Sequence, residues 1–160
     1  MNIMSKAVFA IAAAVAMTGA TAVSAQTATV SPTGAIIAEG TLNQSLLGGQ
    51  YPTQCHVVFQ GTADANGFTL TSYTGTNLNG GELACKESLV FPIRIDAVSP
   101  TQLNVQNLTI QTRLGNCSVS NLPVNWANGS SSVTFPVGTV LAPVCEFNGT
   151  LTVSPKTTIN

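Results

Sequence analysis

Four cysteines are the residues whose number and spacing best define their chemistry: Cys55, Cys85, Cys117 and Cys145. A zinc site built from cysteines usually has close Cys-x-x-Cys pairs or several histidines, and this chain has neither. We therefore predict disulfides and no bound metal ion. Three pairings are open. We favour Cys55–Cys85 with Cys117–Cys145, because this pairing gives two loops of similar size. In the chain-entropy model, each such loop stabilises the fold by about 3 kcal/mol. The sequence alone leaves the pairing undecided.

His56 is the only histidine, and it is therefore the natural candidate for a general base or the partner of a nucleophile. No Gly-x-Ser-x-Gly motif surrounds any serine. The nearest acids in sequence, Glu39 and Asp64, carry no catalytic signature. We interpret His56 as a strand residue without a catalytic role.

The acidic residues offer a second route to catalysis, because glycoside hydrolysis uses two opposed carboxylates. They are Glu39, Asp64, Glu82, Glu87, Asp96 and Glu146. No spacing forces any two of them to face each other. The run 64–67 lacks the later ligands of a calcium loop, so we interpret it as a hairpin turn. With no phosphate or dinucleotide loop in the chain, we predict no catalytic residue and no cofactor.

Trp126 is the only tryptophan and lies just before a turn signal, Asn128-Gly129. An exposed tryptophan at a hairpin tip could stack on a sugar or enter an oily phase. A tryptophan at the end of a strand more often covers the end of a core, and we favour that interpretation. Trp126 stays the one candidate for a surface contact.

The first 25 residues have the pattern of a secretory signal peptide. Lys6 precedes an apolar run, 7–17, and Val23-Ser24-Ala25 supplies the small residues of a cleavage site before Gln26. The run is too short for a comfortable membrane span, and no later stretch is apolar enough for one. We therefore predict an exported protein, extracellular, on the cell surface or periplasmic, with a single β-domain over residues 26–160. An even number of cysteines in an exported chain favours disulfides.

Charged residues make up only 7% of the chain, against roughly a quarter in ordinary soluble proteins. The predicted mature part has four basic residues: Lys86, Arg94, Arg113 and Lys156. They form no cluster, which argues against nucleic acid as a partner. Solubility must instead depend on uncharged polar side chains. Because few charges are available to discourage pairing between strand edges, we also expect that the protein can self-associate.

Apolar residues recur at a spacing of two, which is typical of strands. Asn66-Gly67 lies between two alternating runs and predicts a hairpin. Pro92 inside the run 89–95 predicts an edge or bulged strand, and a phase shift at Asn107-Leu108 predicts a bulge in one long strand. We expect Pro52 to end regular structure in a loop over 48–52. Eight or nine short strands predict an all-β, disulfide-stapled antiparallel β-sandwich or closed β-barrel.

Short motifs, each a turn signal or a cysteine with apolar neighbours, follow one another through the predicted mature chain. They are Ser31-Pro32-Thr33-Gly34, Cys55 with Phe59-x-Gly61, a Gly-rich run into Cys85, Gly115-Asn116-Cys117, Trp126 with Asn128-Gly129 and Phe135, and Cys145 with Phe147-x-Gly149-Thr150-Leu151. This order resembles that of the small secreted bacterial proteins called protein activators of alkane oxidation. The resemblance implies an exported, non-enzymatic protein linked to growth on hydrocarbons, for example by emulsifying them. It assigns no site residue.

Our leading hypothesis is an exported β-protein that acts through its surface, on an oily substrate, on the extracellular matrix or on copies of itself. One alternative is a pilus-type subunit completed by a donated strand, and the alternating arm Thr27–Val30 favours it. The chain end, Thr157–Asn160, lacks the aromatic ending usual in such subunits. A carbohydrate- or ligand-binding module using Trp126 is the other alternative.

Overall fold

The computed structural model describes residues 28–46, 50–79, 85, 88–112, 115–143 and 145–160. These residues form eleven strands: β1 (Val30–Ser31), β2 (Gly34–Leu46), β3 (Gln50–Asp64), β4 (Gly67–Asn77), β5 (Ser88–Leu89), β6 (Ile93–Ser99), β7 (Gln102–Thr112), β8 (Gly115–Ala127), β9 (Ser132–Leu141), β10 (Cys145–Ser154) and β11 (Thr158–Ile159). No helix among them is long and apolar enough to cross a membrane. The predicted signal peptide lies outside the described residues.

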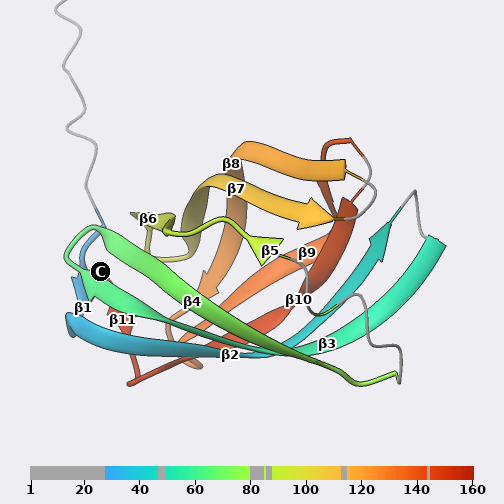
Figure 1. The fold of residues 1–160 in the computed structure, drawn as a ribbon. Helices are drawn as coiled ribbons and strands as arrows, with labels where there is room; N and C mark the ends of the chain where they lie inside the picture. The colour runs from blue at the N-terminus through green and yellow to red at the C-terminus, as the bar shows by residue number, and fades with distance from the viewer. Residues whose placement is uncertain (1–27, 47–49, 80–84, 86–87, 113–114, 144) are drawn as a thin grey trace, which may run out of the picture.

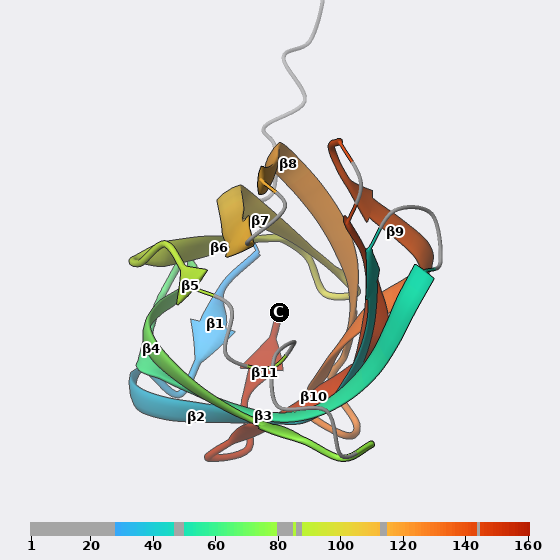
Figure 2. The ribbon, with the colours of Figure 1, turned by 45° about the vertical axis from the view of Figure 1, so that its right-hand side comes forward.

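The main sheet closes into an antiparallel barrel of eight strands. Its hydrogen-bonded order is β7-β6-β4-β3-β2-β10-β9-β8, and β8 pairs again with β7. Strands β2, β3 and β4 run along the bottom of the view in Figure 1, and β7 and β8 along the top. Figure 2 shows the same strands as a ring. The predicted all-β fold is confirmed, and the barrel is the architecture found.

Local sequence explains the first hairpin. In the predicted turn between β3 and β4, the backbone N–H of Asn66 donates to the Asp64 carboxylate at 2.7 Å. Gly67 has a φ of 152°, which a residue without Cβ adopts at little cost. Alternate residues of β4 then turn inward, because successive side chains of a strand point to opposite faces, and Phe68 and Leu70 are buried.

The predicted phase shift in β7 is found, but it is not a bulge of one strand. Gln106 pairs with Asn121 and Leu108 with Val119, so Asn107 of β7 and Ser120 of β8 are both left out of an otherwise continuous register. Asn107 has a φ of 48°. Leu103 and Val105 are buried before it and Leu108 after it, so the inward alternation shifts by one position although β7 has no extra residue relative to β8.

Two predictions about prolines are wrong. The run 89–95 is not one strand, because β5 ends at Leu89 and β6 begins at Ile93, leaving Pro92 between them. Pro52 does not end regular structure but lies within β3. It lies at a register irregularity, where Gln44 pairs with Thr53 and Leu46 with Gln50, and a bulge is one of the few strand positions that tolerate proline.

The first and last described strands meet at one end of the barrel, here called the terminal end. Val30 of β1 pairs with Ile159 of β11, and both side chains are buried. The Asn128 carboxamide joins this pair to the barrel, because its oxygen accepts from the backbone N–H of Ile159 at 2.7 Å. Val30, the last residue of the alternating arm, thus belongs to a short strand that covers the terminal end.

Two neighbouring strand pairs of the barrel are hydrogen-bonded over only part of their length. Strand β4 pairs with β6 through residues 67–70, which leaves 71–77 without a β6 partner: this is the β4–β6 seam. Strand β8 pairs with β9 through residues 125–127 and one bridge, Ser118–Ala142. The β8–β9 seam is the stretch between them, residues 119–124 of β8 and 135–141 of β9.

Prolines help to explain the β8–β9 seam. Pro123 lies in β8 and Pro136 in β9, and neither residue can donate a backbone hydrogen bond. Proline is found in sheets mainly at edges and bulges. The sequence thus removes donors from both strands that face the seam.

Each disulfide lies next to one seam at the barrel end opposite the terminal end, here called the disulfide end. Cys55–Cys85 ties Cys85 to β3 and places it against the unpaired part of β4, where a side chain at Gly75 would collide with the Cys85 carbonyl and where the Tyr73 hydroxyl donates to that same oxygen. Cys117–Cys145 joins β8 to β10 across the β8–β9 seam. The favoured pairing of the cysteines is the one found.

We predict that the Cys117→Ala/Cys145→Ala double variant loses about 3 kcal/mol of unfolding free energy. Its amide hydrogen exchange should also quicken in 119–124 and 135–141, because the β8–β9 seam loses its covalent link. Denaturant unfolding and residue-resolved hydrogen exchange measure the two effects.

The matched control is Cys55→Ala/Cys85→Ala, which opens a loop of similar sequence separation, 30 residues against 28. It should lose a similar free energy but quicken exchange in 71–77 instead. The same exchange pattern in both variants would show that the disulfides act only on the unfolded chain.

Candidate functional site

The inward side chains of the barrel leave an apolar cavity of about 80 Å³. All eight barrel strands and β5 contribute to its lining. Gln44 is the one lining residue outside the aliphatic and aromatic classes. Eight strands give an interior just wide enough to be filled by side chains or to hold one small ligand, and here the filling is incomplete.

The chemistry of this lining selects apolar occupants. A buried water needs two to four polar partners, whereas apolar cavities stay dry and bind apolar molecules. A water needs about 10–15 Å³ of such space, so the cavity has room for roughly five to eight water-sized groups. That room suits several methylene groups and offers no ion or charged group a partner.

Trp126 belongs to this interior. Its side chain is 4% exposed, its ring centroid lies 5.6 Å from that of Phe68, and its indole N–H donates to the Asn128 carboxamide at 2.7 Å. The position agrees with the core interpretation. The ring is not available for a sugar or an oil surface outside the barrel, so the surface contact suggested for Trp126 has no basis in this structure.

The structure brings His56 together with one of the acids considered with it. His56 Nε2 of β3 lies 3.1 Å from Glu39 Oε1 of β2, and the two side chains are 40% and 55% exposed. The pair lies on the outer wall of the barrel. Among the described residues, no group of three or more His, Cys, Asp and Glu could hold a metal ion. Glu82 and Glu87 lie outside the described residues.

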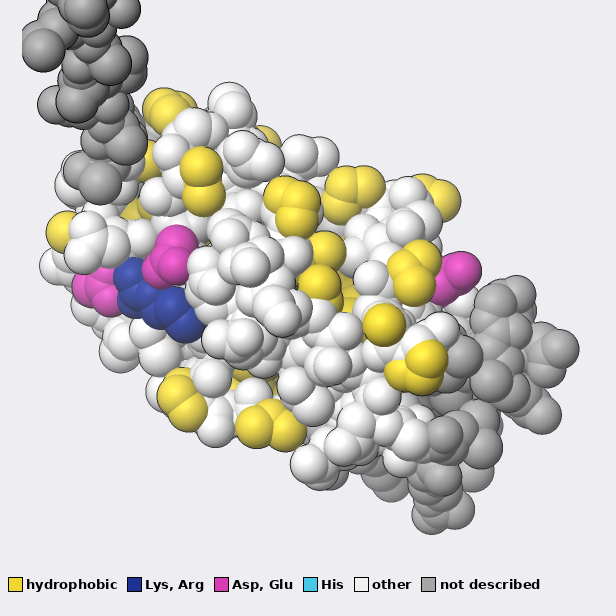
Figure 3. Space-filling model, turned by 90° about the horizontal axis from the view of Figure 1, so that it is seen from above, with side chains coloured by type: hydrophobic (Ala, Val, Ile, Leu, Met, Phe, Trp, Pro, Cys, Tyr) yellow, Lys and Arg dark blue, Asp and Glu magenta, His cyan; other side chains and the backbone are white. Residues whose placement is uncertain are grey.

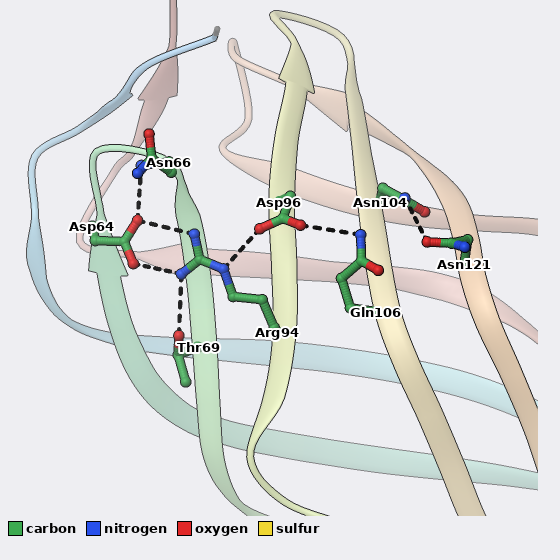
Figure 4. A network of polar contacts seen from close by, with 8 residues as sticks. All are labelled: Asp64, Asn66, Thr69, Arg94, Asp96, Asn104, Gln106 and Asn121. Carbon is green, nitrogen blue, oxygen red and sulfur yellow. Dashed lines mark hydrogen bonds and ion pairs between the residues drawn. The ribbon is translucent and has the colours of Figure 1, made fainter.

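A polar network crosses the outer wall near the terminal end, and we call it the Arg94 ladder (Asp64, Thr69, Arg94, Asp96 and Gln106). Arg94 donates to both Asp64 carboxylate oxygens, to Thr69 Oγ1 at 3.2 Å and to Asp96 Oδ1 at 2.8 Å. Gln106 donates to the other Asp96 oxygen at 3.0 Å. Figure 4 shows the ladder linking β3, β4, β6 and β7. It therefore supports the barrel where the short β6 closes it.

The ladder changes the acidity of its members. The hydrogen bond from Arg94, opposed by partial burial, lowers the pKa of Asp64 below its ordinary value of 3.8. The hydrogen bond to Asp64 in turn raises the pKa of Arg94. A bidentate arginine–carboxylate pair of this kind holds fixed geometry, so the ladder is better suited to structural support than to proton transfer.

Sequence reasoning missed the ladder and the cavity. Arg94 and Asp96 share the outward face of one strand, which was a visible signal, but Asp64 comes from a strand 30 residues earlier. The cavity depends on how twenty-two lining side chains fill a ring. Neither the register nor the packing can be deduced from spacing alone.

Comparison with known families decides the relationship of the chain. The family model described as alkane oxidation protein activator, PraA/PraB-like, matches residues 1–160. The chain belongs to this family. The predicted resemblance is therefore confirmed over the whole chain. No curated protein and no solved structure gives a significant match.

We predict that Arg94→Gln lowers the unfolding free energy at pH 7 by about 1 kcal/mol, a value suited to partly exposed ion pairs. Because the pKa of Asp64 is lowered in the folded state, the pair stabilises the fold above about pH 4, and this contribution disappears as Asp64 becomes protonated at lower pH. The difference between variant and wild type should therefore shrink on acidification. Urea unfolding at pH 7, 5 and 3 measures it.

Lys156→Gln removes an exposed positive charge outside the ladder and is the control. It should change the unfolding free energy by less than about 0.5 kcal/mol. A loss for Arg94→Gln that stays constant down to pH 3 would contradict the assignment to Asp64.

Proposed function

We propose that this protein is exported and promotes alkane oxidation without catalysing it, by adsorbing to the surface of the hydrocarbon. Membership of the alkane oxidation protein activator family supports the link to alkanes. The signal-peptide pattern over residues 1–25 and the two disulfides support export, because disulfides persist mainly in oxidising compartments.

The observation that carries the proposal is a bulge in β9 that exposes an aliphatic side chain. Thr139 pairs with Phe147, and Phe135 pairs with Gly149, so residues 136–138 stand opposite a single residue of β10. Val137 in this bulge is 88% exposed. Bulges commonly change the direction in which a side chain points. Here the bulge turns Val137 to the outside instead of burying it.

The surface around the bulge is suited to an oil–water boundary. Val140 of the same strand is 50% exposed, and other large aliphatic side chains are exposed elsewhere: Ile37, Leu78, Val90 and Val98. Figure 3 shows apolar side chains scattered among uncharged polar ones, with the charged side chains confined to a few places. Because few charged side chains lose their hydration when such a surface adsorbs to oil, the desolvation cost of adsorption is small.

A non-catalytic role is supported by the engagement of the titratable groups. His56 contacts Glu39, and Arg94 contacts Asp64 and Asp96. These contacts lie at the outer wall, away from the apolar cavity. A donated strand stays the alternative, but the ring order of the described strands already closes through the pairing of β7 with β8.

We predict that the purified protein lowers the interfacial tension between hexadecane and water, and that Val137→Ser/Val140→Ser needs several-fold more protein for the same effect. The two serines remove aliphatic surface that would otherwise leave water at the interface. Pendant-drop tensiometry measures the effect, with unfolding curves to confirm that the variant is folded.

The control is Val98→Ser, which makes the same chemical change at a side chain that is 48% exposed on β6. It should leave the tension curve close to that of the wild type. A wild-type protein with no surface activity would overturn the proposed function, and equal losses in both variants would overturn the role of the β9 bulge.

A further inference from the structure

The cavity meets the β8–β9 seam at Phe135. This residue lies in the seam segment of β9 and also lines the cavity. Its ring packs on Phe147 of β10, with centroids 4.9 Å apart, and its exposed fraction is only 8%. A molecule crossing the seam toward the interior would therefore meet the Phe135 ring.

Like the β4–β6 seam, the β8–β9 seam is a stretch where the wall can part with little loss of hydrogen bonding. No register pair joins β8 and β9 between Ser118–Ala142 and Asn125–Thr134. The β9 bulge lies in this stretch and has no register partner in β10 either. Its Val137 stands at the outer side of the seam, so an exposed aliphatic group and a cavity-lining phenyl ring lie two residues apart.

The shape of the cavity favours a linear occupant. Along β2 its lining extends from Ile36 to Gln44, a distance of roughly 26 Å along the strand. A volume of about 80 Å³ spread over such a length is narrow. An unbranched alkyl chain fits a narrow apolar space, whereas a compact ring of the same carbon number does not.

We propose that the barrel interior binds one linear alkyl chain, which enters between β8 and β9 past Phe135. This inference rests on the proposed function and deepens it, because it gives the hydrocarbon a defined place inside the protein. Binding would transfer a single chain from the oil surface into a water-borne carrier. The chain is held by apolar contact alone, and no bond is made or broken.

Trp126 provides the measurement, because it is the only tryptophan and it lines the cavity. The purified protein is equilibrated with n-hexane at rising activity in the vapour phase, and then with cyclohexane, a compact C6 hydrocarbon. n-Hexane should shift the tryptophan emission saturably, and solvent extraction with gas chromatography should recover about one chain per protein. Cyclohexane should produce neither effect.

Ala38→Leu tests the location of the site. Ala38 lines the cavity and is buried, so the larger side chain occupies room that the ligand needs. Affinity for n-hexane should fall about tenfold or more, which corresponds to excluding about two methylene groups. Ala35→Leu makes the same change on the outer face of the same strand and should bind like the wild type. Should Ala38→Leu fail to fold, Leu151→Ala enlarges the lining and should shift the preferred n-alkane to a longer chain.

The rate of association tests the route of entry. In stopped-flow fluorescence, Cys117→Ala/Cys145→Ala, which frees the β8–β9 seam, should bind n-hexane several-fold faster than Cys55→Ala/Cys85→Ala. Equal association rates would overturn entry at this seam.

The outcomes separate this inference from the proposed function. A protein that lowers oil–water tension but shows no saturable n-hexane binding would overturn the inference and leave the proposed function standing. Binding that Ala38→Leu and Leu151→Ala both leave unchanged would place the hydrocarbon outside the cavity and would also overturn it. Loss of surface activity with retained, Ala38-sensitive binding would overturn the surface proposal alone.

Discussion

The barrel must close although two of its neighbouring strand pairs lack a complete hydrogen-bond ladder, and the rest of the structure depends on how this is achieved. At the β4–β6 seam, the Arg94 ladder joins the strands at the terminal end, and the Cys55–Cys85 disulfide places Cys85 against the unpaired part of β4 at the other end. At the β8–β9 seam, three residue pairs hold the terminal end and the Cys117–Cys145 disulfide the other. Covalent bonds thus act where prolines and short strands leave the backbone unpaired.

This arrangement separates two apolar surfaces with different roles. The inner surface is a lining of aliphatic and aromatic side chains around a small cavity. The outer surface carries scattered aliphatic groups, of which Val137 is the most exposed of the large hydrophobic side chains described. The β8–β9 seam is the place where the two come closest, because Phe135 and Val137 belong to the same short stretch of β9. For a member of the alkane oxidation protein activator family, both surfaces are of the kind that hydrocarbon would contact.

Sequence patterns predicted the features that depend on neighbouring residues. Asn66-Gly67 predicted the β3–β4 hairpin, and the spacing of apolar residues predicted the shift of alternation at Asn107 in β7. Both follow from local geometry. The favoured cysteine pairing was also found, although loop size was only a weak argument for it. Asn148-Gly149, by contrast, carries the same turn signal but lies inside β10, because its neighbours pair with both β2 and β9.

Features that depend on distant residues were not accessible in this way. Whether strands form a ring or two layers depends on the pairing of β7 with β8 and of β2 with β10, and residues of the latter pair are about a hundred positions apart. The Arg94 ladder depends on the same long-range register. The cavity is the small difference between the interior volume of the barrel and the volume of the side chains that point into it. The spacing of residues in the sequence does not determine this difference.

Nuclear Overhauser contacts between the methylene protons of n-hexane and the isotope-labelled protein test most directly whether hydrocarbon is held inside this barrel and not only on its outside. For a chain held inside, we expect contacts to the rings of Trp126 and Phe135 and to the methyl groups of Val105 and Leu151. Contacts confined to exposed side chains such as Val137 and Val140, with none to the cavity lining, would contradict binding inside the barrel.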